Sequence, residues 1–312
     1  MPSLFGSKQG DSADWLAVAV HADRIDVARM ELSPTGRPAV RVCESSPKKG
    51  SDVETLARLR KSLKPRGVRC ASLLLAGQYQ MQLVEAPTVP ADEVKQAVRW
   101  KLKDLLDYPV DAATVDVIPV PSDATGVGRA QYVYAVSARN ENIGAHMRLF
   151  HAARFPLEAI DVPEMAQRNI ARLFEEPNRG VAMLVVDEHG GMLTFTSGGR
   201  LYLSRHTDIN LAQLTAPSAE LREQARERLV LELQRSIDHF DRQFGFITLS
   251  RLLLAPLPPH YDLQPYLAEH LYLPVQAIDL VDAIDFPGAP ELRDPQLQTA
   301  RLHILCAALR SD

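Results

Sequence analysis

The sequence predicts an α/β protein of two lobes, with a small α+β subdomain inserted in the first lobe. The chain has 312 residues, enough for about two domains of ordinary size. Its hydrophobic content of 46% and charged content of 24% are typical of globular proteins and argue against a disordered or fibrous chain. Each half of the chain also starts with an antiparallel meander and continues with alternating helices and strands. The same architecture is therefore expected twice.

The first lobe is expected to cover residues 1–178. Two apolar-rich stretches joined by a short polar turn predict a hairpin, and a third strand follows it. Apolar residues three and four positions apart then predict a helix. In order, the expected elements are the strands Trp15–Val20, Arg24–Leu32 and Pro38–Glu44, the helix Asp52–Leu63, and the strands Val68–Leu75 and Tyr79–Glu85.

The inserted subdomain is expected at about residues 79–161. Its clearest helix is Ala91–Leu106, which must end near Pro109 because the residue before a proline disfavours helical backbone. The apolar face of that helix consists of Val94, Val98, Leu102 and Leu105. The elements that complete the subdomain are the strands Val115–Pro119 and Ala130–Ser137, the helix Asn142–Ala153 and the strand Leu157–Asp161.

The second lobe is expected at residues 179–312, after a helix at Glu164–Phe174. Ser218 is placed to cap a long helix that runs to about Phe244. The apolar stripe of the long helix is formed by Leu221, Ala225, Leu229, Leu233, Ile237, Phe240 and Phe244. The other expected elements are the strands Val181–Asp187, Gly191–Ser197, Arg200–His206, Leu252–Ala255 and Pro274–Asp279, and the helices Gln264–Glu269 and Pro295–Leu309.

Charge and cysteine content limit the possible partners and compartments. The chain has 35 Lys+Arg and 39 Asp+Glu residues, so no overall positive field attracts nucleic acid or an anionic membrane. Its three cysteines are far apart in sequence, which favours a reducing compartment. No apolar run approaches the roughly 18 residues that span a bilayer, and Met1–Asp14 is too polar for a secretory signal. We expect a cytoplasmic protein that binds no nucleic acid.

Five stretches, in this order and spacing, carry a resemblance to a known family. They are Gln96–Pro109, Ala112–Pro119, Ile160–Glu164, Glu232–Asp238 and Ala307–Arg310. The chain resembles the PilM-like family of type IV pilus assembly proteins, and most closely its MSHA-type (MshI) members. The resemblance implies a two-lobed actin-like fold, similar to that of PilM and FtsA. It also implies a partner, the cytoplasmic N-terminal tail of a PilN-like inner-membrane protein, held between the first lobe and the small subdomain.

The first phosphate hairpin departs from the pattern of nucleotide-binding members. In an active actin-like ATPase, each of two hairpins needs an acidic residue for Mg²⁺ and a glycine that lets backbone N–H groups approach the phosphates. The acidic position falls on Ala19 and the glycine position on His21. Where the adenosine motif has a glycine pair, the chain has Pro256-Leu257-Pro258-Pro259, and proline removes an N–H donor.

The second hairpin keeps part of the pattern. Asp187 stands at the acidic position, but His189 replaces the expected glycine. Gly190 and Gly191 follow, so Asp187, Gly190 and Gly191 are the residual cofactor-binding candidates. We expect no bound cofactor and no ATPase activity; the alternative is a site for ATP with Mg²⁺.

Other catalytic patterns are missing from the sequence. It contains no GxSxG elbow, P-loop, GxGxxG turn or HExxH helix, so no catalytic residue and no metal ligand is predicted. Asp238, His239 and Asp241 fall opposite the apolar stripe of the long helix and are expected on a solvated face.

Trp100 and Tyr108 are the candidate partner-binding residues. Trp100 lies well off the apolar line of its helix, and Tyr108 stands at the end of the same segment. Tryptophan and tyrosine supply much of the binding energy at protein interfaces. The alternative role for Trp100 is to cover an edge of the small subdomain.

The resemblance and the altered hairpins together predict a non-catalytic cytoplasmic scaffold of a type IV (MSHA-type) pilus assembly platform. Its expected partners are the PilN-like tail and other platform proteins, so it would reach the membrane only through a partner. Two alternatives are an active actin-like ATPase of pilus assembly and the cytoplasmic domain of a type II secretion assembly protein. The latter normally continues into a transmembrane helix, so this alternative is expected to weaken if the 312 residues, which end at Asp312, are the natural full length.

Overall fold

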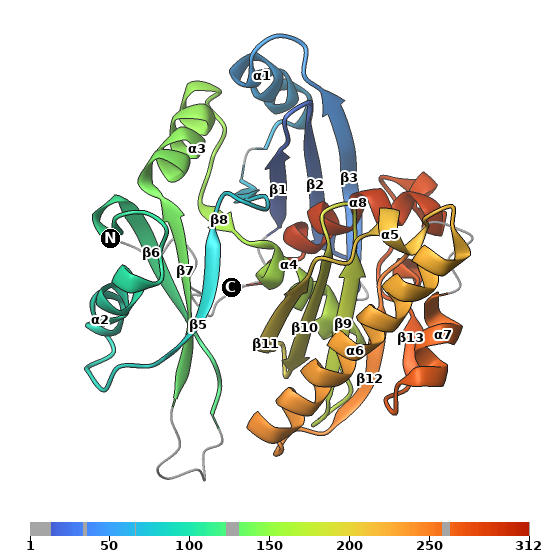
Figure 1. Ribbon diagram of the computed structural model, residues 1–312. Coiled ribbons are helices and arrows are strands. Elements are labelled where there is room, and N and C mark those ends of the chain that lie inside the picture. Colours follow the sequence, from blue (N-terminus) through green and yellow to red (C-terminus); the bar gives the residue numbers. More distant parts are fainter. Residues whose placement is uncertain (1–13, 34–35, 66, 123–130, 258–262, 312) are drawn as a thin grey trace. The chain divides into compact units, whose positions relative to one another are not determined.

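The computed structural model describes residues 14–33, 36–65, 67–122, 131–257 and 263–311 (Figure 1). The chain forms two compact units. The first unit consists of Met1–Leu32, Arg41–Pro163 and Ala307–Asp312, and the second of Ser33–Val40 and Glu164–Cys306. The segment between the expected strands Val115–Pro119 and Ala130–Ser137 lies mostly outside the described residues, and so do Pro258 and Pro259 of the expected adenosine motif.

The first unit contains a five-stranded sheet with the strand order β3-β2-β1-β4-β8. The central strand β1 is antiparallel to β2 and parallel to β4, which in turn is parallel to β8. The strands are β1 (Trp15–Val20), β2 (Arg24–Leu32), β3 (Pro38–Pro47), β4 (Arg69–Leu73) and β8 (Ala159–Asp161). The predicted hairpin and the meander of this lobe are thus present.

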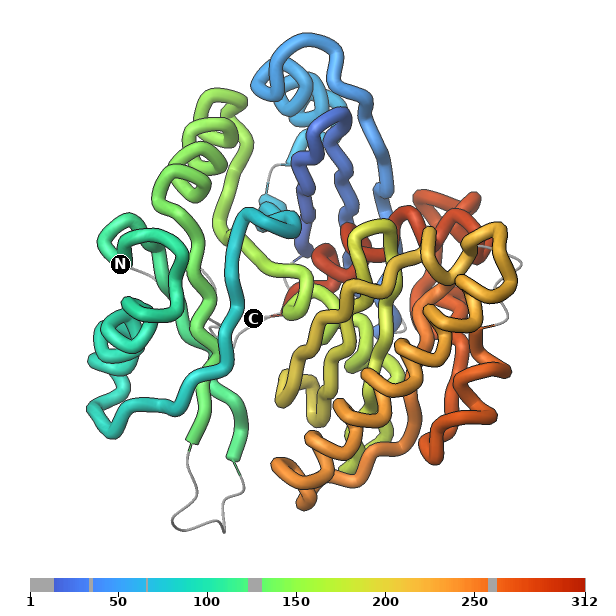
Figure 2. Tube along the Cα trace, viewed as in Figure 1, coloured from blue at the N-terminus to red at the C-terminus, as the bar shows by residue number. Residues whose placement is uncertain are grey.

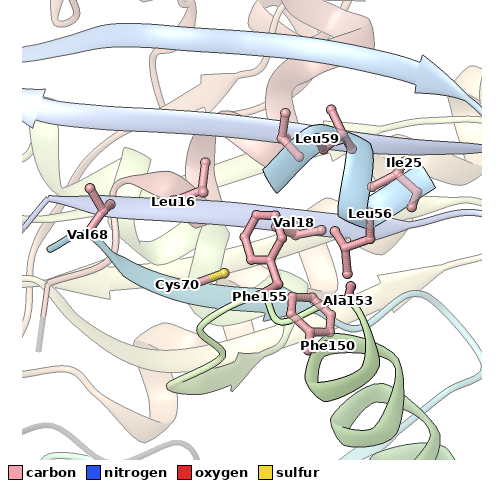
Figure 3. Packing of buried hydrophobic residues seen from close by; sticks show 11 residues of the cluster. Leu16, Val18, Ile25, Leu56, Leu59, Val68, Cys70, Phe150, Ala153 and Phe155 are labelled. Carbon is pink, nitrogen blue, oxygen red and sulfur yellow. The ribbon is translucent and has the colours of Figure 1, made fainter. Parts of the chain in front are cut away.

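One helix against this sheet is α1 (Asp52–Leu63). It begins with a capping box in which Ser51 and Glu54 bond each other's backbone N–H groups. The apolar face of α1 meets the sheet and the end of another helix, α3 (Asn140–Ala152), in one continuous core (Figure 3). The residues labelled in that view are Leu16, Val18, Ile25, Leu56, Leu59, Val68, Cys70, Phe150, Ala153 and Phe155. Burial of these side chains is the main force that holds α1 and α3 on the sheet.

The small subdomain has a sheet of its own, with the strand order β5-β7-β6 and antiparallel pairing throughout. Its strands are β5 (Gln80–Glu85), β6 (Ala113–Pro119) and β7 (Tyr132–Arg139). The α-helix α2 (Val94–Lys101) continues as the short 3₁₀-helix η1 (Leu102–Asp104), and a second 3₁₀-helix, η2 (Val110–Ala112), precedes β6. Figure 2 shows the chain leaving the first sheet after β4, forming this sheet, and returning through α3 to β8.

Two expectations for the subdomain are wrong in detail. The strand expected at Leu157–Asp161 belongs to the first sheet, as β8, because it pairs with β4. Leu105 was expected on the core face of α2 but is 51% exposed. The reason is that helical structure ends at Asp104, so Leu105 lies beyond the helix from which its position was predicted. Leu106 packs against the subdomain core instead.

The second unit repeats the order of the first, with the strands β11-β10-β9-β12-β13. The central strand β9 is antiparallel to β10 and parallel to β12, as β1 is to β2 and β4. The strands are β9 (Gly180–Val186), β10 (Gly191–Ser197), β11 (Arg200–Thr207), β12 (Leu249–Leu254) and β13 (Val275–Ala277). The doubled architecture predicted from the sequence is thus present.

The long helix α6 (Ala219–Gln243) lies across the second sheet and begins, as expected, with Ser218 as its cap (Figure 1). Phe240 stacks on Phe195 of β10, with 4.7 Å between ring centroids. Leu221 was expected in the apolar stripe but is 55% exposed. The buried side chains of α6 begin only at Ala225. The other helical segments are α5 (Leu211–Leu214), α7 (Leu263–His270), η4 (Leu280–Asp282), η5 (Pro290–Arg293) and α8 (Pro295–Ala308).

The boundary between the units differs from the expected one at residues 178 and 179. The helix α4 (Pro163–Ala171) and the 3₁₀-helix η3 (Arg172–Phe174) belong to the second unit from Glu164 onward. The reason is a buried polar contact, in which the side-chain amide of Gln167 donates to the carbonyl of Met183 at 2.7 Å and to Thr194 Oγ1 at 2.9 Å. In addition, the C-terminal residues from Ala307 belong to the first unit.

No helix in the described part of the chain has both the length and the hydropathy needed to cross a bilayer.

Candidate functional site

The first predicted phosphate hairpin joins β1 to β2. Ala19 is buried, and its methyl group offers no oxygen to a hydrated cation. The imidazole Nε2 of His21, in the turn, lies 3.0 Å from Oδ2 of Asp26. The side chain of His21 therefore points back to its own hairpin, at the position where the family pattern has a glycine.

Asp26 is a residue that sequence reasoning missed. It is the cross-strand partner of Ala19, so the two side chains share one face of the sheet. Its carboxylate accepts hydrogen bonds from Ser45 Oγ and Arg24 Nε in addition to the contact with His21. Burial raises the pKa of Asp26, but the hydrogen bonds from His21 and Ser45 and the nearby charges outweigh it, so the pKa is lowered. The carboxylate of this hairpin is thus engaged from three sides.

The second predicted phosphate hairpin joins β9 to β10 and is closed by Asp187. Oδ1 of Asp187 accepts the backbone N–H groups of His189 at 2.7 Å and of Gly190 at 3.1 Å. The same two N–H groups would be the donors for a bound anion, and here they are occupied by the hairpin's own carboxylate. The other oxygen of Asp187 lies 3.5 Å from His303 Nε2 of α8.

Gly190 and Gly191 serve the packing of this hairpin. Gly190 has a φ of +154°, and a Cβ atom there would lie 2.5 Å from the carbonyl oxygen of Thr207. A Cβ at Gly191 would lie 2.6 Å from Cγ2 of Thr207. Both glycines are required for the close approach of the hairpin to the end of β11.

A buried carboxylate, Glu164 at the start of α4, lies close to the same hairpin. His206 Nε2 of β11 lies 3.0 Å from its Oε1, and Glu164 is 2% exposed. The hydrogen bond to Glu164 raises the pKa of His206, against the effect of burial, and the charges of Glu164 and Asp187 add to the increase. The hydrogen bond with His206 thus engages the Glu164 carboxylate within the protein.

Pro256 stands directly after β12, where the adenosine motif was expected. It is buried, and its carbonyl oxygen accepts the hydroxyl of Thr299 at 3.1 Å. The neighbouring Ala255 donates its N–H to the carbonyl of Leu184. The backbone at Ala255 and Pro256 is therefore bonded within the protein.

A pocket of about 300 Å³ lies between β11 and α6, within the second unit. Its floor is aliphatic and its rim is cationic. Leu193 and Arg205 line it from the sheet, and Leu233, Arg235, His239 and Arg242 line it from α6. His239 was expected on a solvated face together with Asp238 and Asp241; Asp238 and Asp241 are exposed, but His239 is partly buried and lines this pocket.

The two predicted partner-binding residues have different environments. Trp100 is 65% exposed and points away from Val98 and Leu102, the fully buried residues of its segment. Tyr108 is 8% exposed and belongs to the core of the small subdomain. The guanidinium of Arg139 covers the Tyr108 ring at 4.1 Å from its centroid. Trp100 is thus available to a partner, whereas Tyr108 is mainly a packing residue.

Tyr108 also lines a second pocket, of about 440 Å³, which follows η1 on the subdomain. The residues around it include Lys103, Asp107 and Asp111. The hydroxyl group of Tyr108 itself is buried and has no hydrogen-bond partner among the described residues. The described residues likewise contain no group of three His, Cys, Asp or Glu side chains able to hold a metal ion.

Comparisons with known proteins address the fold. No protein-family model and no curated protein matches the chain. A solved structure described as the PilM-PilN type IV pilus biogenesis complex is similar over 95% of this chain and 98% of that chain, with 17% identity and a TM-score of 0.69. The chain has an actin-like fold. The two five-stranded sheets of the same strand order and the small subdomain are the parts of this fold.

Two further solved structures are similar at lower scores. One is the cytoplasmic domain of EpsL, an inner membrane component of the type II secretion system of Vibrio cholerae. It shares 13% identity over 92% of this chain and 94% of that chain, with a TM-score of 0.46. The other is a protein of Bacteroides thetaiotaomicron with an actin-like ATPase fold, at 8% identity over 93% and 96% of the two chains and a TM-score of 0.45.

Proposed function

We propose that this protein is a non-catalytic cytoplasmic scaffold of a type IV (MSHA-type) pilus assembly platform. In this role it binds the cytoplasmic N-terminal tail of a PilN-like inner-membrane protein and reaches the membrane only through that partner. The observation that carries the proposal is the similarity to a PilM-PilN complex over nearly the whole of both chains. The name of that complex is the basis for the choice of partner.

The chemistry of the two hairpins favours a scaffold over an ATPase. Ala19 has no ligand atom for Mg²⁺, and the Asp187 carboxylate occupies the N–H groups of its own turn. Glu164, the buried carboxylate close to that turn, is bonded to His206. A nucleotide would have to displace these interactions before its phosphates could bind.

The exposed Trp100 supports a peptide partner on the small subdomain. A tryptophan that is 65% exposed leaves much apolar surface in contact with water, and burying it against a partner is favourable. A peptide tail is typically held by a few such anchors together with main-chain hydrogen bonds.

The proposal is tested with a synthetic peptide that carries the cytoplasmic N-terminal tail of a PilN-like protein from the same organism. Isothermal titration calorimetry should show saturable binding of this peptide and no binding of a scrambled peptide of the same composition. Failure of the native tail to bind would contradict the proposal. Turnover of ATP with Mg²⁺ by the purified protein would instead support the alternative of an active ATPase.

A further inference from the structure

The pocket between β11 and α6 has an unusual concentration of positive charge. Arg205 projects from β11 on the same face as its cross-strand partner Leu193, towards α6. Arg235 and Arg242 line the pocket from the helix. The acidic lining residue is Glu232, which lies 3.7 Å from Arg235. Three arginines against one glutamate leave the rim with a net positive charge.

Two of these arginines have no counter-ion in the part of the chain that the structure describes. Among those residues, neither Arg205 nor Arg242 forms an ion pair or a side-chain hydrogen bond. The acidic residues Asp238 and Asp241 on the same stretch of α6 face elsewhere, since both interact with Tyr272, whose hydroxyl donates to Asp241 at 3.0 Å. The positive charge of the pocket is therefore not neutralised by the neighbouring turn of the helix.

His239 also lines the pocket, near the charges of Arg205 and Arg242. Burial lowers its pKa, the charges of Arg205 and Arg242 lower it further, and a hydrogen bond with Gln243 opposes them. No carboxylate contributes to the shift. An anion that entered the pocket would be attracted to both guanidinium groups and would lie close to the imidazole.

The floor of the pocket indicates what else the ligand carries. Leu184, Leu193, Leu229 and Leu233 line it, and all four side chains are otherwise buried. An aliphatic floor favours contact with an apolar or aromatic group, while guanidinium groups favour phosphate because they donate two parallel hydrogen bonds to its oxygens. The volume of about 300 Å³ is at the lower end of the range of small-molecule sites.

We propose that this pocket binds a small organic phosphate, with the phosphate held by Arg205 and Arg242 and the apolar part of the ligand on the leucine floor. The site is independent of the proposed scaffold function, because all its residues lie in the second unit and the proposed tail-binding residue Trp100 lies in the first. It also differs from the predicted phosphate hairpins, whose N–H donors and carboxylates it does not use.

The test uses the full chain and phenyl phosphate as a probe, with inorganic phosphate as the comparison ligand. Binding is followed by calorimetry at low ionic strength and by the chemical shift of the His239 ring protons. We expect phenyl phosphate to bind more tightly than inorganic phosphate and to shift the His239 resonance. Arg205→Gln and Arg242→Gln should each weaken binding about tenfold or more, as expected for the loss of a charge-assisted hydrogen bond.

Arg228→Gln is the matched control. It removes the same charge from the same helix, but Arg228 does not line the pocket and pairs with Asp208 at 2.9 Å. The proposal is overturned if phenyl phosphate at millimolar concentration leaves His239 unshifted, or if Arg228→Gln weakens binding as much as Arg242→Gln. It is also overturned if binding requires Mg²⁺ and survives both pocket substitutions, because the phosphate would then lie at the Asp187 hairpin. Binding of the PilN-like tail should be unchanged in all three variants.

Discussion

Nε2 of His206 lies 3.0 Å from Oε1 of Glu164, so a half-exposed imidazole covers a carboxylate that is 2% exposed. Asp187, in the neighbouring turn, adds negative charge near the same imidazole. These interactions make the end of β11 and the start of α4 a polar contact that depends on protonation of one histidine. They also keep the Glu164 carboxylate engaged within the protein.

The first prediction concerns the pH dependence of this contact. Because Glu164 raises the pKa of His206 above its usual value of about 6.5, the stabilisation should be fully present below about pH 6.5 and should be lost as the pH rises through the higher, folded-state pKa. His206→Gln should lower the free energy of unfolding by about 1 kcal/mol or less at pH 5.5, since water screens the half-exposed ring. The difference should nearly vanish at about pH 9.

Urea denaturation of the two proteins at both pH values measures this effect. The control is His151→Gln, which removes an exposed histidine from α3. An equal loss of stability at both pH values would show that the charge of His206 is not what matters.

The second prediction concerns the C-terminal residues. Arg310 donates to Asp161 at 2.8 Å, and both side chains are at most 9% exposed. Its guanidinium also lies 5.1 Å from the centroid of the Trp15 ring. Arg310→Ala leaves the Asp161 carboxylate buried without this counter-ion, so the free energy of unfolding should fall by roughly 3–5 kcal/mol.

The control for Arg310 is the exposed pair of Arg228 and Asp208, for which Arg228→Ala should cost less than about 1 kcal/mol. Combining Arg310→Met with Asp161→Asn should recover part of the loss, since no unpaired charge remains. Chemical denaturation of the variants decides between these outcomes. A loss from Arg310→Ala no larger than that from Arg228→Ala would contradict the assignment of a buried ion pair.

The third prediction separates the two aromatic residues of the subdomain. Trp100→Ala should leave stability within about 0.5 kcal/mol of the wild type, because the side chain is 65% exposed. It should weaken binding of the PilN-like tail by about thirtyfold, or roughly 2 kcal/mol, if Trp100 is an anchor. Melting temperature and tail affinity are measured on the same preparation. Full binding by a well-folded Trp100→Ala protein would remove Trp100 from the site.

The fourth prediction concerns Tyr108, which is 8% exposed. Tyr108→Ala should lower the free energy of unfolding by roughly 3–5 kcal/mol, because it opens a cavity in the subdomain core. Tyr108→Phe should be neutral or slightly stabilising, because the hydroxyl that it removes is buried without a partner among the described residues. Thermal denaturation compares the three proteins. A marked loss of stability in Tyr108→Phe would show that the hydroxyl has a partner after all.

The fifth prediction concerns nucleotide. ATP with Mg²⁺ should bind more weakly than 10 μM, a binding free energy of roughly −7 kcal/mol. The reason is that Ala19 offers no ligand and that Asp187 occupies the turn N–H groups. Calorimetric titration with and without Mg²⁺ measures the affinity, and tighter binding that depends on Mg²⁺ would refute this expectation.

Local pattern determined most elements of this protein. Apolar stretches joined by short turns predicted the β1–β2 hairpin and the meander of the second unit, and apolar residues three and four positions apart predicted the helix capped at Ser218. These signals depend on neighbours in sequence. The same reasoning placed Trp100 off the core line of α2, and it is exposed. The sequence alone also shows that Ala19 and His21 stand where nucleotide-binding members of the family have an acidic residue and a glycine.

Long-range pairing and packing decided the rest. The strand at Ala159–Asp161 joined the first sheet because β4 offered a parallel edge, and Glu164 joined the second unit because Gln167 bonds strands that lie further along the chain. Sequence spacing does not show that Asp26 lies opposite Ala19, since the register of a hairpin depends on its turn. Nor does it show that Arg205 and Arg242 line one pocket, because 36 positions separate them in sequence and only the packing of α6 on the sheet brings them together.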